Sequence, residues 1–118
     1  MKPARFAVPA AFAALLAMAQ PALAKPVYLS CVTVENGQTE QFELTADEEA
    51  GTVSLFEPSS GGSRLMRAAF TRNQVSFSDG VIFDYWINRT DLSIVVQRIN
   101  GSIAKGKCQL QPPPKRAF

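Results

Sequence analysis

From residue 27 onward, apolar and polar residues alternate in short runs that turn-forming residues separate. A period of two is typical of half-buried β-strands, and no long run has the period of a helix. The alternation predicts eight strands, at residues 27–35, 38–45, 52–56, 64–70, 74–78, 81–88, 91–99 and 102–110. The sequence therefore predicts an all-β domain.

The register of each hairpin follows from the requirement that its apolar side chains share one face. A two-residue Asn36-Gly37 turn meets this requirement and places Cys31 opposite Phe42. The same kind of turn at Asn100-Gly101 would set lysines opposite apolar residues. A three-residue loop that ends in glycine is therefore expected there, with Val96 opposite Ala104.

Two further turns complete the predicted register. A three-residue loop at 78–80 would place Phe77 opposite Val81, and a turn around Arg89-Thr90 would place Ile87 opposite Leu92. Together these registers predict a single buried set: Leu29, Cys31, Phe42, Leu44, Val53, Leu55, Val75, Phe77, Val81, Phe83, Tyr85, Ile87, Leu92, Ile94, Val96 and Cys108.

The two cysteines, Cys31 and Cys108, fall in the first and last predicted strands. In an exported protein such a pair most simply forms a disulfide, whereas redox-active cysteines are usually much closer in sequence. Eight strands connected in order place the first beside the last. We therefore expect a small antiparallel up-and-down barrel closed by one disulfide, with a two-sheet β-sandwich as the alternative.

The first 24 residues have the layout of a secretory signal peptide. Lys2 and Arg5 precede an apolar run at 6–19, and Ala22-Leu23-Ala24 is a small-x-small ending. We expect cleavage after Ala24, a periplasmic or secreted location, and no membrane insertion of the mature chain. The predicted barrel domain then spans residues 25–110, followed by a proline-rich tail at 111–118.

Charge and composition exclude several classes of function. Lys2 and Arg5 are two of the 12 basic residues, so the chain without its leader has as many basic residues as its 10 acidic ones. A neutral domain gives no reason to expect nucleic acid or an anionic membrane as a partner. The chain has no histidine, the commonest general base and zinc ligand, and no cofactor or metal is expected.

One face of the predicted hairpin at 81–99 carries unexpected apolar residues. Trp86, the only tryptophan, is expected to face outward with Ile82 and Asp84, close to Val95 on the next strand. Exposed apolar patches and tryptophans are frequent in protein interfaces, so these four residues are the candidate partner-binding surface. The alternative is that Trp86 belongs to a second small core.

Three short features resemble those of small exported bacterial domains that hold one disulfide. They are Cys31 in the first strand, Ile87-Asn88-Arg89 in a hairpin, and Gly106-Lys107-Cys108 near the end. This resemblance implies a periplasmic location and β architecture. A looser similarity in size, leader and disulfide links the chain to periplasmic inhibitors of lysozyme, although Ser60-Gly61-Gly62-Ser63 lacks the aromatic residue of one known inhibitory loop.

These observations lead to a hypothesis of a non-catalytic exported binding module, with an inhibitor or immunity-type protein acting on a cell-envelope enzyme as its most concrete form. We expect no enzyme activity. One alternative is a small hydrolase that uses Asp84 with Glu43 or Glu40, because paired carboxylates can perform acid–base chemistry. Another is a structural envelope protein with no discrete ligand. The sequence does not predict an oligomeric state.

Overall fold

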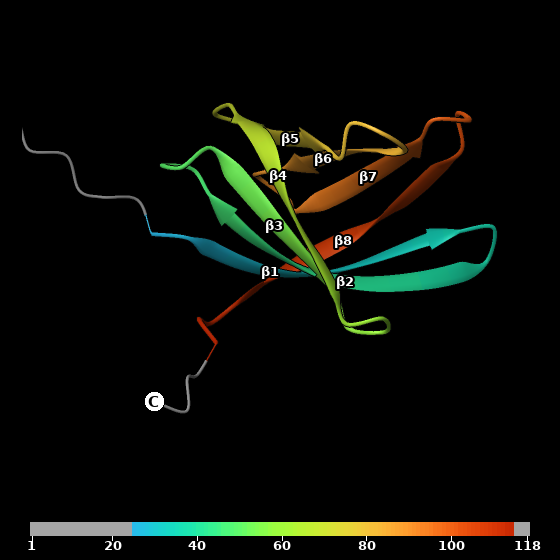
Figure 1. The fold of residues 1–118 in the computed structure, drawn as a ribbon, viewed down its shortest axis with the longest axis horizontal. Coiled ribbons are helices and arrows are strands. Elements are labelled where there is room, and N and C mark those ends of the chain that lie inside the picture. Colours follow the sequence, from blue (N-terminus) through green and yellow to red (C-terminus); the bar gives the residue numbers. More distant parts are fainter. Residues whose placement is uncertain (1–24, 115–118) are drawn as a thin grey trace, which may run out of the picture.

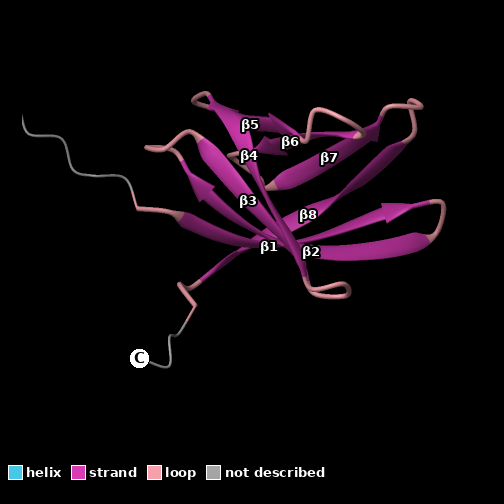
Figure 2. Cartoon of the chain, viewed as in Figure 1, coloured by secondary structure: helices cyan, strands magenta, loops and turns pink. Residues whose placement is uncertain are grey.

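The computed structural model describes residues 25–114, which form a closed antiparallel barrel in chain order, with β8 pairing back to β1 (Figure 1). The strands are β1 (Val27–Glu35), β2 (Gln38–Asp47), β3 (Thr52–Glu57), β4 (Gly62–Phe70), β5 (Gln74–Ser78), β6 (Phe83–Asn88), β7 (Ser93–Arg98) and β8 (Ile103–Gln111). Figure 2 shows strands, turns and loops but no helix in this part of the chain. The all-β barrel is confirmed and replaces the sandwich alternative.

The predicted signal peptide, residues 1–24, lies outside the described residues, as do residues 115–118 of the predicted tail. Of the tail, Gln111 is the last residue of β8 and the three prolines that follow are exposed. Within residues 25–114, no helix is long and apolar enough to cross a membrane.

The seam of the barrel is the pairing of β1 with β8. Cys31 lies directly opposite Cys108 and the two form the predicted disulfide. Two residues along each strand, Gly106 lies opposite Thr33. A Cβ atom at Gly106 would overlap the carbonyl oxygen of Val32, so the two strands approach here as closely as only glycine allows.

Two of the predicted hairpins are confirmed. Asn36 and Gly37 form a two-residue turn with φ of 52° and 77°, the left-handed values that this turn type requires. Between β7 and β8 the loop has three residues and ends at Gly101, which has a φ of 92°. Val96 lies opposite Ala104, as expected.

The predicted register between β5 and β6 is wrong by four residues, because Phe77 pairs with Tyr85 rather than with Val81. The Asp79 side chain causes this shift. Its Oδ1 atom accepts hydrogen bonds from the backbone amides of Val81, Ile82 and Phe83 at 2.9, 2.9 and 3.0 Å, and these bonds fold residues 79–82 into a loop. Val81, predicted to be buried, is therefore 70% exposed.

The predicted register between β6 and β7 is wrong by two residues, because Ile87 pairs with Ile94 rather than with Leu92. Asn88 Oδ1 accepts hydrogen bonds from the amides of Thr90 and Asp91, which lengthens the loop to residues 89–92. Both errors are even numbers of residues. Since side chains alternate between faces, neither error moves an apolar residue to the wrong side of the strand.

The barrel interior is a single apolar cluster of buried residues. The cluster comprises Leu29, Cys31, Phe42, Leu44, Ala46, Val53, Leu55, Met66, Val75, Phe77, Tyr85, Ile87, Ile94, Val96, Ala104 and Cys108. Phe83 and Leu92, predicted as core, pack against it while only partly buried. Ala46, Met66 and Ala104 are core residues that the predicted set omits.

The up-and-down topology gathers four hairpin loops at one end of the barrel: residues 36–37, 58–61, 79–82 and 99–101. On one side of this end the wall is incomplete. β4 pairs with β5 only from Ala68 to Phe70, so the first half of β4 continues beyond its neighbour. The interior is therefore open to solvent at this end.

Candidate functional site

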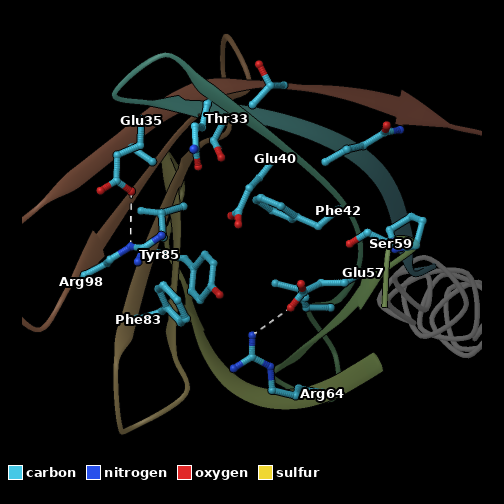
Figure 3. A pocket seen from close by; sticks show the side chains of 17 residues that line it. Thr33, Glu35, Glu40, Phe42, Glu57, Ser59, Arg64, Phe83, Tyr85 and Arg98 are labelled. Atoms are coloured by element: carbon cyan, nitrogen blue, oxygen red, sulfur yellow. Dashed lines mark hydrogen bonds and ion pairs between the residues drawn. The ribbon is translucent and has the colours of Figure 1, made fainter. Parts of the chain in front are cut away.

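A cavity of about 520 Å³ occupies the open end of the barrel, which we call the mouth cavity. Its floor includes the inward-facing side chains of Thr33, Phe42 and Tyr85 from β1, β2 and β6. Its rim carries charged side chains at the ends of strands: Glu35, Glu40, Glu57, Arg64 and Arg98. Figure 3 shows these groups directed toward a common space.

The alternation of the strands explains how charged residues reach the inside of a barrel. Cys31, Thr33 and Glu35 occupy successive inward positions of β1, so the interior changes from apolar to charged as the strand leaves the core. On β7, Val96 is buried and Arg98 is the next inward position. The charged residues of the rim thus occupy the same inward-facing positions along each strand as the core residues, one position nearer the open end.

Both arginines of the rim are held by carboxylates. Arg98 Nε lies 3.3 Å from Glu35 Oε1. Arg64 Nη2 lies 3.4 Å from Glu57 Oε1, and its Nη1 lies 3.1 Å from Asp79 Oδ2. The first and second of these ion pairs appear as dashed lines in Figure 3.

The ring of Phe83 lies between the two guanidinium groups. Arg64 Cζ is 5.8 Å and Arg98 Cζ is 5.4 Å from the ring centroid, distances at which cation–π attraction operates. The two cations therefore have electrostatic partners on several sides, which restricts their positions in the rim.

Asp79 forms an ion pair with Arg64 and so restricts the position of the guanidinium group. Burial raises the pKa of the Asp79 carboxyl. Hydrogen bonds from the amides of Phe83, Val81 and Ile82, together with the charge of Arg64, lower the pKa by more than burial raises it, so it lies below its ordinary value. The carboxylate is ionised at neutral pH. The same side chain thus shapes the β5–β6 loop and holds a charged member of the rim.

Glu40 differs from the other acidic residues of the rim. Within residues 25–114 it forms no ion pair with a lysine or arginine, whereas Glu35 and Glu57 each do. Figure 3 shows its carboxylate directed into the mouth cavity, on the side of Phe42 and Tyr85. Glu40 is therefore a charge that the described residues leave without a counter-ion.

Two buried hydroxyl groups belong to the floor. Thr33 is 2% exposed and Tyr85 is 4% exposed, and both line the mouth cavity. Within residues 25–114 neither hydroxyl takes part in a side-chain hydrogen bond, and Ser102 Oγ is the one enclosed side-chain oxygen or nitrogen there without a partner. The hydroxyls of Thr33 and Tyr85 are therefore open to the cavity, where a bound group can reach them.

The Tyr85 ring is fixed by aromatic neighbours. It stacks on Phe77 with centroids 4.6 Å apart and meets Phe42 edge-on at 6.3 Å. Burial raises the pKa of its hydroxyl, with Arg64 opposing and nearby acidic groups adding to the rise, to about 12. The hydroxyl is therefore protonated at neutral pH, when it can both donate and accept a hydrogen bond.

A second cavity, of about 320 Å³, lies at the opposite end of the barrel and has a more apolar lining that includes Phe70 and Leu92. Arg89 links the loops there, because its Nη2 lies 2.8 Å from Glu48 Oε1 and its Nη1 donates to the Thr71 carbonyl at 2.7 Å. These bonds join three loops across this end. Glu48, the middle residue of the acidic run Asp47-Glu48-Glu49, thus contributes an ion pair to the scaffold.

The predicted partner-binding residues lie on the outer face, away from the mouth cavity. Trp86 pairs with Val95 and is half-buried, and it is not part of the core cluster of the described residues. Asp84 is exposed, and Ile82 is 45% exposed in the β5–β6 loop. The structure pairs Trp86 with Val95 and sets Asp84 at the next position of the same face of β6, whereas Ile82 lies in the loop before β6 and not in a strand as predicted. A partner for this face stays a prediction.

The carboxylates suggested for a hydrolase do not share a site. Glu40 enters the mouth cavity, whereas Glu43 and Asp84 occupy positions that alternate with buried neighbours and so face outward. No group of three or more His, Cys, Asp or Glu side chains among the described residues could hold a metal ion. The residues that sequence reasoning missed are Glu35, Glu57, Arg64 and Arg98, and the available signal was a charge at an inward position next to each strand end.

Comparison with known proteins found no family model, no curated protein and no solved structure that matches this chain. The candidate site is therefore described from the geometry of this chain alone.

Proposed function

We propose that this protein is a non-catalytic binding module that receives part of its partner in the mouth cavity. The observation that carries the proposal is the cavity of about 520 Å³ at one end of the barrel, with the hydroxyls of two buried residues, Thr33 and Tyr85, in its floor. Binding sites combine an apolar surface with a few polar groups that fix orientation. Phe42 and Tyr85 supply the apolar surface, and the rim and hydroxyls supply the polar groups.

The proposal places the protein outside the cytosol, with a cell-envelope protein as its partner. The leader pattern at residues 1–24 and the Cys31–Cys108 disulfide support this location, because disulfides persist in oxidising compartments. Inhibition of, or protection against, a wall-degrading enzyme is the most concrete form of this activity, since such a role needs a binding surface and no chemistry.

The intact mass of protein recovered outside the cytosol tests the location. We expect a chain that begins at Lys25, with both cysteines oxidised. A mass that includes residues 1–24, or one that shows two free thiols, would contradict the proposal.

A cavity-filling variant tests whether the partner enters the mouth cavity. Ala104 lines the cavity from β8 and is 8% exposed, so Ala104→Phe places a ring in the space that the partner would occupy. Immobilised oxidised protein should retain its envelope partner, and Ala104→Phe should lose at least about 90% of that retention, a change of roughly 1.4 kcal/mol or more. Equal near-ultraviolet circular dichroism spectra establish that the variant is folded.

Two further variants distinguish binding in the mouth cavity from binding on the Trp86 face. Thr33→Val keeps the side-chain shape but removes a floor hydroxyl, and it should weaken retention without filling the cavity. Trp86→Ala alters the outer face and should leave retention nearly unchanged. Retention that Trp86→Ala abolishes while Ala104→Phe preserves it would place binding on the Trp86 face, and an absence of any retained component would contradict the binding function.

A further inference from the structure

We infer that the mouth cavity recognises an ammonium group carried on a short apolar stem, as in a lysine side chain or a small alkylamine. This inference rests on the proposed function, because it names the chemistry of the group that enters the cavity. The charges of the rim, the Glu40 carboxylate and the floor of the cavity all favour such a group.

The rim carries more negative than positive charge. Glu35 neutralises Arg98 at 3.3 Å, and Arg64 has two carboxylates, Glu57 and Asp79, at 3.4 and 3.1 Å. The two guanidinium charges are therefore already compensated. An entering anion would have to displace one of these carboxylates and would also meet the charge of Glu40, whereas an entering cation displaces nothing.

Glu40 supplies an uncompensated negative charge inside the mouth cavity. Its carboxylate is directed into the cavity (Figure 3), and it has no lysine or arginine partner within residues 25–114. Because one side of this site is the apolar interior of the barrel, the attraction between Glu40 and an ammonium group is less screened than on an open surface.

The floor suits the remainder of such a ligand. The rings of Phe42 and Tyr85 offer an apolar surface for a methylene stem, and an aromatic ring face also attracts the cation itself. The hydroxyls of two buried residues, Thr33 and Tyr85, open onto the cavity and can accept hydrogen bonds, and an ammonium group has three N–H donors. Phe83, by contrast, already faces two guanidinium groups.

The experiment compares three probes that each contain four carbon atoms: n-butylamine, n-butanol and butyrate. Each is titrated into oxidised, isotope-labelled protein, and the dissociation constant is taken from the backbone amide shifts of Thr33, Glu40 and Tyr85. We expect butylamine to bind more tightly than butanol, and butyrate to bind more weakly than butanol. Butyrate binding as tight as that of butylamine would overturn the ammonium inference but leave the mouth cavity as a binding site.

Two matched carboxylate variants assign the effect to Glu40. Glu40→Gln should weaken butylamine binding by about fivefold, near the upper end of what a partly exposed ion pair contributes, and should leave butanol unaffected. Asp84→Asn removes an exposed carboxylate from the outer face and should change neither. Equal weakening by both variants would show a diffuse charge effect and overturn the role of Glu40.

Two further arms identify the source of the group and separate the two proposals. A tripeptide Gly-Lys-Gly with both ends blocked should bind at least as tightly as butylamine if the group is a protein side chain, and less tightly if it is a free amine. If none of the probes shifts the mouth amides while the envelope partner is still retained through the cavity, the ammonium inference fails alone. If the partner is not retained either, both proposals fail.

Discussion

At the scale of single residues, Tyr85 connects the core to the candidate site. Its ring packs on Phe77 and Phe42 inside the barrel, and its hydroxyl reaches the mouth cavity. An aromatic side chain that is apolar along its body and polar at its tip is suited to the boundary between a core and a ligand. Its pKa of about 12 provides a way to observe this position directly.

Tyr85 should make the stability of the protein depend on pH in alkaline solution. The folded state keeps the phenolic proton up to about pH 12, whereas the unfolded chain loses it near the ordinary pKa of 10.0. Because the folded state then holds the extra proton, the free energy of unfolding should fall as pH rises from 10 to 12, by about 2 to 3 kcal/mol in total. Urea denaturation across this range measures the change.

Tyr85→Phe is the control for this effect, because it keeps the ring and removes the titrating group. We expect the variant to show a smaller decline between pH 10 and 12 than the native protein. The same decline in both proteins would mean that other groups cause it and that Tyr85 ionises freely in the folded state.

At the scale of elements, the sequence predicts strands and faces well, and loop lengths less well. Eight strands, the disulfide and two hairpin registers follow from alternation and turn residues. The two misplaced registers have a common cause, because Asp79 and Asn88 each accept backbone hydrogen bonds and so lengthen their loops. A pattern of apolar residues cannot detect an error of two or four residues, since the same face remains buried.

The candidate site was less predictable for a related reason. Each charged residue of the rim occupies an inward position near a strand end. Alternation predicts that such a side chain points inward, but not whether it meets packed core side chains or an open cavity. The cavity depends on the combined lengths of four hairpins, and one of them is the loop that Asp79 reshapes. A single tryptophan at an outward position is easily recognised in a sequence, whereas the alternation does not show that Glu40 faces an open cavity.

Gly106 should be the least replaceable residue of the seam between β1 and β8. A Cβ atom there would overlap the Val32 carbonyl and come within 2.7 Å of the Thr33 Cα, both backbone atoms that cannot move aside separately. Gly106→Ala should therefore destabilise the protein by about 1 to 3 kcal/mol or more, as overpacking does. Thermal unfolding of the oxidised protein measures the loss.

Gly62→Ala offers the comparison for Gly106. Its Cβ atom would lie 3.3 Å from the Ser60 side-chain oxygen, an atom that can rotate away, and Gly62 does not have a positive φ. We expect little change in its unfolding temperature. A Gly106→Ala protein as stable as Gly62→Ala would contradict the close approach of the two strands.

At the scale of the whole molecule, the interior of a closed barrel can contact solvent only at its two ends. The disulfide joins strands 77 residues apart in sequence, and closing a loop of that length contributes about 4.5 kcal/mol in the chain-entropy model. The two ends then differ. Arg89 joins three loops at one end, whereas the other end holds the larger cavity and the charged rim.

The distribution of charge adds to this asymmetry. The chain after the predicted leader has equal numbers of basic and acidic residues, yet the rim with Asp79 has four carboxylates and two guanidinium groups. A neutral molecule with a local negative site at its opening attracts a cationic group to that site without binding polyanions elsewhere. This charge distribution supports the proposal that a ligand enters at the mouth cavity.

A crystal structure of the oxidised protein with n-butylamine tests this central claim most directly. We expect the ammonium nitrogen within hydrogen-bonding distance of the Glu40 carboxylate, with the stem against Phe42 and Tyr85. Butylamine found on the Trp86 face or at the Arg89 end, with the mouth cavity filled only by solvent, would contradict it.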